Sequence, residues 1–168
     1  MTKKNIYTLK RIIILGIIIA IASFVIININ KKDKANVKGG IISEGIISGY
    51  TEDEIKEILQ RKADESTFSF EINSRPIFKD GESEGNLRIA NPPYNKYSIE
   101  VEIRLDYNNQ LVFESGEIPP YHYIENAKLN KKLKAGQYDA TATISAFDSE
   151  TGDFKGKSTA KLVIKVES

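Results

Sequence analysis

The chain has few side chains that could do chemistry, since it contains one histidine and no cysteine. His122 lies in the stretch Pro119–Ile124, directly after a double proline. As a general base it would need an orienting carboxylate and a nucleophile. Three candidates are near in sequence, although no motif links them to the histidine: Ser115, Glu117 and Glu125. We therefore interpret His122 as a surface-loop residue, and predict a protein that is not an enzyme, without a catalytic residue or a cofactor.

Two tyrosines, Tyr121 and Tyr123, flank this histidine. Exposed aromatic side chains on a loop bury a large area and lose little conformational entropy, so they are frequent contact residues at protein interfaces. We predict that Tyr121, His122 and Tyr123 contact a protein partner. The alternative is that the tyrosines cover one end of the folded domain.

Two acidic loops offer oxygen ligands for a cation. Residues 80–85 and 148–153 each combine three carboxylates with glycine. Calcium takes about six to eight oxygen ligands from such loops, but neither loop follows the EF-hand spacing. Because Asp and Gly also favour hairpin turns, we interpret both loops as turns and predict no metal site. Weak calcium binding by Asp148, Glu150 and Asp153 is the alternative.

The charges of the chain are unevenly distributed. The formal net charge is +1, but residues 1–34 carry seven basic groups and one acid, which leaves a net charge of −5 on residues 35–168. This acidic balance argues against nucleic-acid binding. The domain has one basic cluster, which we interpret as ordinary loop or strand alternation, with binding to anionic envelope polymers as the alternative: Lys128, Lys131, Lys132 and Lys134.

Residues 12–29 are almost entirely apolar, and no charge follows Arg11 until Lys31. As an α-helix this stretch would reach about 27 Å, close to the hydrocarbon thickness of a bilayer. We predict a single transmembrane helix in contact with membrane lipid, preceded by a basic cytoplasmic tail at residues 1–11. A cleaved signal peptide is the alternative, because Ala20–Ala22 has the small-x-small form of a cleavage site.

The orientation of this helix depends on the charges beside it. Four basic residues precede the helix and four lysines follow it closely, so the positive-inside rule is nearly balanced. The free amino terminus favours a cytoplasmic tail. We therefore predict a single-pass, signal-anchor protein of the cell membrane with its C-terminal domain outside the cytoplasm.

Residues 30–50 are polar or rich in glycine and contain two Ile-Ile pairs, at 41–42 and 46–47. Glycine disfavours a stable helix here, so we interpret this stretch as a linker that tethers the domain to the bilayer. The alternative is that the two Ile-Ile pairs dock onto another surface, since four exposed isoleucines would be unusual in a free linker.

A short amphipathic helix is predicted over residues 51–65. Thr51 and Glu54 have the spacing of a capping box at its start. Ile55, Ile58 and Leu59 then fall on one face. Since so short a helix is marginal by itself, we predict that this apolar face packs against the following domain or a partner.

Residues 66–168 show the alternation of half-buried β-strands. Apolar residues at every second position from Tyr97 to Tyr107 predict one strand with a buried face, and similar runs occur at 68–72, 87–89, 138–146 and 160–166. Turn residues separate the runs, as at Asn108–Asn109 and Pro119–Pro120. These patterns predict a mainly β domain, an antiparallel β-sandwich of about seven strands.

Residues 133–142 resemble the tyrosine corner of fibronectin type III and immunoglobulin-like domains. The resemblance implies that Leu133 anchors the end of the preceding segment, Gly136 takes the bend and Tyr138 bonds back to the backbone near residue 133. The fold class implied is a bacterial immunoglobulin-like sandwich. More loosely, the whole layout is similar to small membrane-anchored cell-envelope proteins of Gram-positive bacteria, some of which are encoded beside conjugation or secretion machinery.

Together these features predict a structural or protein-interaction module held outside the membrane, as an accessory of an envelope complex for secretion or conjugation. The expected contact residues are Tyr121, His122, Tyr123, Ile55, Ile58 and Leu59. The alternative is a surface receptor domain that binds carbohydrate or calcium. The sequence does not indicate the partner.

Overall fold

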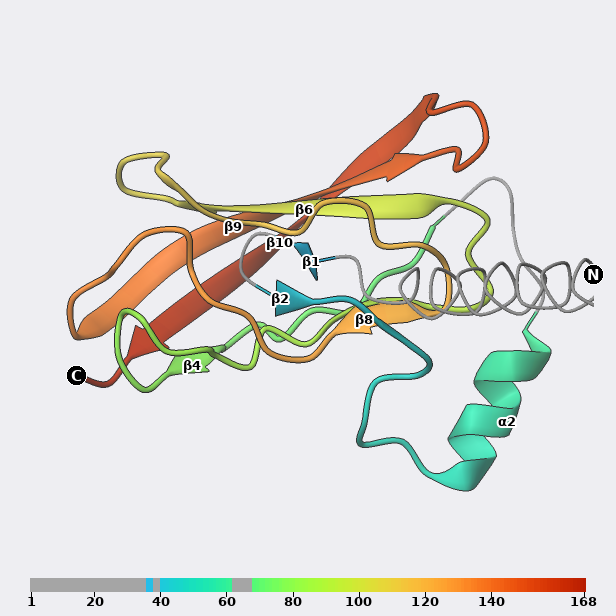
Figure 1. The fold of residues 1–168 in the computed structure, drawn as a ribbon, viewed down its shortest axis with the longest axis horizontal. Helices are drawn as coiled ribbons and strands as arrows, with labels where there is room; N and C mark the ends of the chain where they lie inside the picture. The colour runs from blue at the N-terminus through green and yellow to red at the C-terminus, as the bar shows by residue number, and fades with distance from the viewer. Residues whose placement is uncertain (1–35, 38–39, 62–67) are drawn as a thin grey trace, which may run out of the picture. The chain divides into compact units, whose positions relative to one another are not determined.

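The computed structural model describes residues 36–37, 40–61 and 68–168, which form a mainly β structure with one short helix (Figure 1). The elements are β1 (Asn36–Val37), β2 (Gly40–Ile41), β3 (Ser43–Glu44), α2 (Glu52–Gln60), β4 (Ile77–Phe78), β5 (Ile89–Asn91), β6 (Ser98–Leu105), β7 (Leu111–Glu114), β8 (His122–Ile124), β9 (Gly136–Phe147) and β10 (Phe154–Val166).

The strands form two main sheets. One has five strands in the order β4-β10-β9-β6-β7, and the other has three in the order β3-β8-β5. The pairs within both sheets are antiparallel except for β4 and β10, which run parallel. The predicted sandwich was expected to be antiparallel throughout. The exception arises because residues 74–79 run along the edge of β10 in its own direction, with four backbone hydrogen bonds from residues 163, 165, 167 and 168.

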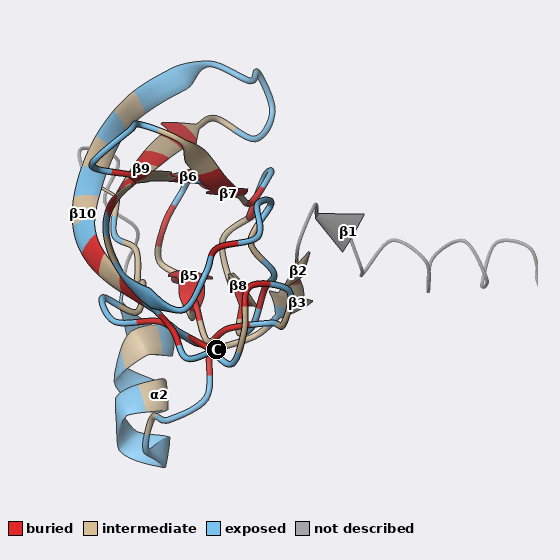
Figure 2. Cartoon of the chain, turned by 90° about the vertical axis from the view of Figure 1, so that its left-hand side faces the viewer, coloured by how far each residue is buried: buried red, intermediate tan, exposed pale blue. Residues whose placement is uncertain are grey.

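One hydrophobic core lies between these sheets (Figure 2). β6 and β9 bury alternate residues, as their sequence pattern predicts: Ile99, Val101, Ile103 and Leu105 from β6, and Ala140, Ala142, Ile144 and Ala146 from β9. Ile89 of β5 and Ile124 of β8 belong to the same core from the small sheet. The period-two alternation therefore indicates which side of each strand is buried.

The prediction for Tyr107 is wrong. Its side chain was expected to continue the buried face of β6, but it is 70% exposed. β6 ends at Leu105 and a turn follows, in which Asn109 has a positive φ of 57° and the Asn109 N–H donates to the Leu105 carbonyl. Alternation carries no information on burial once the strand has ended.

The tyrosine corner is confirmed. The Tyr138 hydroxyl donates to the Lys134 carbonyl oxygen at 2.9 Å, Leu133 is buried, and Gly136 begins β9 with a φ of 154°. The phenol therefore bridges the loop that enters β9 and the strand itself. This bridge holds the start of the central strand of the large sheet.

Two buried asparagines connect the sheets. The Asn91 Nδ2 group at the end of β5 donates to the carbonyls of Tyr97 and Ile118, at 2.9 and 2.8 Å. Asn95 donates to Asn91 Oδ1 and accepts a hydrogen bond from the Ser69 N–H. These bonds fix the crossing of the chain from β5 to β6.

The predicted membrane anchor, residues 12–29, lies outside the described residues, as do the tail at 1–11 and part of the linker. In the part of the chain that the structure describes, no helix has the length and apolar character to cross a bilayer.

We predict that Tyr138→Phe lowers the free energy of unfolding by about 1 kcal/mol, the typical net contribution of one hydrogen bond. Tyr107→Phe is the matched control, because the exposed Tyr107 ring lies in a turn. Urea unfolding in detergent solution, followed by tyrosine fluorescence, measures both variants. Equal stability of the two variants would contradict a structural role for the corner.

Candidate protein-contact surface

Residues 40–50 lie against the domain, which differs from the interpretation of this stretch as a free tether. Ile42 and Ile47, one from each Ile-Ile pair, are only 3% and 2% exposed. The Gly45 N–H donates to the Tyr121 carbonyl at 2.7 Å, and β3 pairs with β8. The alternative, that the isoleucine pairs dock, therefore describes this part of the predicted linker.

Arg88 also binds this segment. Its Nη1 donates to Glu125 Oε1 at 2.7 Å, and its Nη2 donates to the Ser48 carbonyl oxygen. The Ser48 hydroxyl also donates to Glu125 Oε1, at 3.1 Å. One guanidinium, from the residue just before β5, thus connects the segment before α2 to the residue just after β8. We call residues 40–50 the N-terminal strap.

The strap covers the first of the predicted contact sites. His122 and Tyr123 were expected in an open loop, but they form β8, between β3 and β5. Tyr121, His122 and Tyr123 are all half-buried. The His122 Nδ1 atom lies 2.9 Å from the Pro120 carbonyl oxygen, which can only accept, so Nδ1 donates its proton there. Their placement makes these residues mainly part of the domain's own packing.

The second predicted site, α2, is better exposed. The capping box is confirmed: the Glu54 N–H donates to the Thr51 hydroxyl oxygen, and the Thr51 N–H donates to the Glu54 carboxylate. The helix ends at Gln60, earlier than the predicted residue 65, since Arg61 has an extended backbone and residues 62–65 lie outside the described residues. None of its residues is buried, and Leu59 is 54% exposed, with Ile55 and Ile58 half-exposed.

The domain holds α2 at both ends. Before the helix, the Tyr50 phenol donates a hydrogen bond to the Glu71 carboxylate, which together with burial raises the pKa of Tyr50 to about 12. After the helix, the Arg61 guanidinium lies 4.7 Å from the centre of the Tyr94 ring. The structure therefore positions the helix while its apolar face remains accessible.

In the calcium alternative, two of the three proposed ligands, Asp148 and Asp153, have other partners. Asp148 Oδ1 accepts from the N–H groups of Glu150 and Thr151, which lowers the pKa of Asp148. Lys155 Nζ lies 3.6 Å from Asp148 and 3.8 Å from Asp153. Within the described residues, no group of three or more His, Asp and Glu side chains is placed to hold a metal ion. These contacts are those of a hairpin turn.

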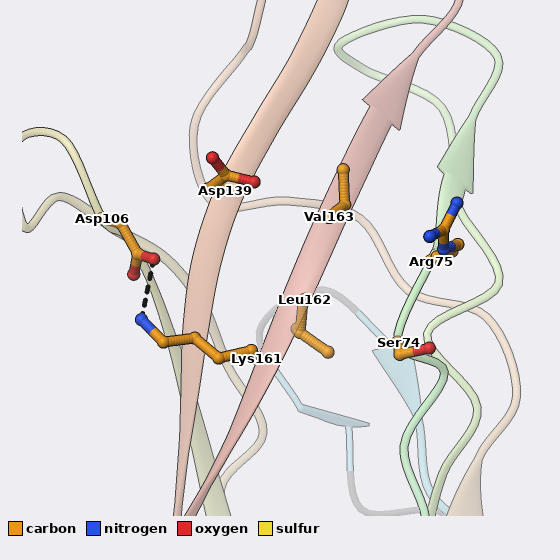
Figure 3. Close-up of a pocket in the computed structure, with 7 residues that line it drawn as sticks. All are labelled: Ser74, Arg75, Asp106, Asp139, Lys161, Leu162 and Val163. Carbon is orange, nitrogen blue, oxygen red and sulfur yellow. Dashed lines mark hydrogen bonds and ion pairs between the residues drawn. The ribbon is translucent and has the colours of Figure 1, made fainter.

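An open groove of about 410 Å³ on the large sheet was not anticipated from the sequence (Figure 3). Lys161 Nζ donates to Asp106 Oδ2 at 2.9 Å, and this bond and one from the Thr141 hydroxyl lower the pKa of Asp106. Asp139 and Arg75 lie on opposite sides of Val163, and their side chains form no hydrogen bond or ion pair with another described residue. No local motif could have indicated this groove, because its lining comes from four separate segments.

The two predicted contact sites are therefore distinct surfaces, of which α2 is the more exposed. The comparisons with protein-family models, curated proteins and solved structures find no match to this chain.

Loss of the Arg88 guanidinium should loosen the strap. We predict that Arg88→Ala raises the rate of proteolysis within residues 45–50 several-fold under native conditions, because local opening then costs less. Arg104→Ala is the control, since Arg104 pairs with Glu102 on the exposed face of the sheet. Cleavage sites and rates are measured by mass spectrometry. Similar rates at 45–50 in both variants would show that Arg88 does not hold the strap.

The Tyr50 phenol should lose its proton at a higher pH than an ordinary tyrosine, because its pKa is raised. Its hydrogen bond to Glu71 stabilises the neutral form, so its contribution to stability is present below pH 10 and is lost as the pH rises through about 12. We predict that, in an ultraviolet titration at 295 nm, Tyr50→Phe removes a step near pH 12. Removal of a step near pH 10 would mean that the bond to Glu71 is absent in solution.

Proposed function

We propose that this chain is a membrane-anchored protein-interaction module, an accessory of an envelope complex for secretion or conjugation, with its β domain outside the cytoplasm. The observation that carries this proposal is α2. Its apolar residues remain exposed although contacts at both ends hold the helix in place. An amphipathic helix presented in this way is suited to bind in a groove of a partner protein.

The fold proposed for the domain is immunoglobulin-like. In that fold the C, F and G strands share one sheet, the B and E strands share the other, and the tyrosine corner lies at the start of strand F. Here β6, β9 and β10 are neighbours in one sheet, β5 and β8 pair in the other, and Tyr138 lies near the start of β9. β6, β9 and β10 then correspond to strands C, F and G, and β5 and β8 correspond to strands B and E, which supports the proposal. Such a fold serves many functions, so the function rests on α2.

The proposed location rests on the sequence of residues 1–29. The apolar stretch at 12–29 has the length of a membrane span, and the amino terminus adds to the positive charge before it. Protease added to cells without their wall should therefore degrade the domain beyond Gly49. Complete protection of residues 50–168, with lysed cells showing the same protein to be cleavable, would contradict an extracytoplasmic domain.

The interaction is tested by site-specific photo-crosslinking in intact cells. A photoreactive amino acid replaces Glu52, which is exposed on α2 and borders the face formed by Ile55 and Leu59. We expect adducts of defined mass that disappear when Ile55→Ser and Leu59→Ser are added. The matched control carries the same label at Asn109, in the exposed turn after β6. Equal labelling from both positions, or no adduct from position 52, would contradict a contact through α2.

A ligand-binding receptor domain is the second candidate, and the groove favours it. Asp139 and Arg75 offer opposite charges across Val163, which suits a small polar ligand that carries both charges. Amide shifts around Val163 should then respond to a free amino acid such as lysine, and Arg75→Gln should abolish the response. Unchanged spectra at millimolar lysine would remove support for this candidate.

A further inference from the structure

We infer that the exposed face of α2 binds the basic segment 128–134 of a second copy of this chain, so that copies associate head to tail. This inference rests on the proposed function, because it identifies the partner of the α2 contact surface. It is carried by the charges of the two surfaces, by the apolar residues beside those charges, and by the separation of the two surfaces within one copy.

The α2 surface is acidic around its apolar face. Residues 52–60 contain four acids and one base, a net charge of −3. Their ion pairs, Lys56 with Asp53 and Arg61 with Glu57, are highly exposed, and such pairs contribute little to stability. The carboxylates can therefore exchange these partners for others.

The segment 128–134 has the opposite character. It contains four lysines and no acid, a net charge of +4. Lys132 pairs with Glu82 at 3.0 Å, while no ion pair to a described residue is found for Lys128, Lys131 or Lys134. An apolar side chain lies nearby: Gly40 pairs with Ala127, and the next residue, Ile41, is 52% exposed. This basic surface with an apolar neighbour complements the acidic, apolar surface of α2.

The two surfaces are attached at opposite ends of β6. Arg61, after α2, contacts Tyr94, which precedes the first residue of β6, Ser98. The Asn130 N–H donates to the carbonyl of Val112, in the part of β7 that pairs with Ile103 and Arg104 near the other end. β6 is about 23 Å long at about 3.3 Å per residue. Figure 1 also places α2 and the segment that enters β9 at opposite ends of the domain.

The charges of the two surfaces favour a contact between the α2 surface of one copy and the basic segment of another. A symmetric pairing of two α2 helices would bring together two surfaces with a net charge of −3 each. A pairing of two basic segments would bring together two surfaces with a net charge of +4 each. Like charges in contact are unfavourable, whereas the unlike pairing is attractive. In a head-to-tail contact of this kind one of each surface stays free, so further copies can be added.

Because the chain has no cysteine, single cysteines can test this contact in the full-length protein. Gln60→Cys marks α2 and Asn130→Cys marks the basic segment, and both replace exposed, uncharged residues. The two variants are mixed in phosphatidylcholine vesicles and treated with a short bis-maleimide. We expect the 60–130 adduct to exceed the 60–60 and 130–130 adducts roughly tenfold, and to fall with added salt, which screens the charges.

Charge reversal separates specific contact from misfolding. Glu52→Lys, Asp53→Lys and Glu57→Lys, added together to the Gln60→Cys variant, change the net charge of residues 52–60 from −3 to +3 and should lower the 60–130 adduct roughly tenfold. Lys128→Glu, Lys131→Glu and Lys134→Glu, added together to the Asn130→Cys variant, change the net charge of segment 128–134 from +4 to −2 and should do the same. Mixing the two reversed variants should restore the adduct. Restoration would also show that both reversed variants remain folded.

Three outcomes would overturn the inference: a dominant 60–60 or 130–130 adduct, a 60–130 yield no higher than that of a Thr151→Cys control in the exposed turn between β9 and β10, or no recovery when both surfaces are reversed. None of these contradicts the proposed function by itself. If the photoreactive label at position 52 still gives specific adducts in cells, α2 binds a different protein, and only the identification of the partner as a second copy fails.

Discussion

The hydrogen bonds of Asn91 and Asn95 are the constraint on which the arrangement of the sheets depends. Both side chains are nearly completely buried, and no buried side-chain nitrogen or oxygen among the described residues lacks a partner. An unsatisfied buried amide would cost about 1–3 kcal/mol, so the chain between β5 and β6 has little freedom to take another path. β6 therefore starts at a defined place, and its pairing with β9 sets the register of the large sheet.

The need to satisfy polar groups also applies to the edges of the sheets. The strap covers the edge of β8, and residues 74–79 cover the end of β10. Along residues 157–161 no described residue pairs with the outer edge of β10, but Lys157 and Lys161 lie there, and lysines disfavour the addition of another strand. With these two edges protected, α2 is a described element that offers an accessible apolar face fixed at both ends.

Local patterns predicted the parts of this fold that local physics decides. Alternation placed the buried residues of β6 and β9, and the residue types around Tyr138 indicated the corner that the Lys134 carbonyl completes. Asp148 forms a turn, as its neighbours suggested. The same reasoning failed at Tyr107, because a period of two does not show where a strand stops. It also failed to distinguish docked from free isoleucines in the strap, because Ile42 and Ile47 pack against residues far away in the sequence.

By itself, the sequence determined that residues 66–168 are mainly β, that a capped helix begins after Thr51, and that cysteine chemistry is absent, because composition, capping and periodicity act over a few residues. The tertiary structure decided which surface remains available. It placed His122 and Tyr123 in a strand that pairs with the strap, brought Asp139 and Arg75 to one groove, and left Leu59 exposed. These outcomes depend on contacts between distant segments, and a contact between distant segments has no signature in the local pattern of either one.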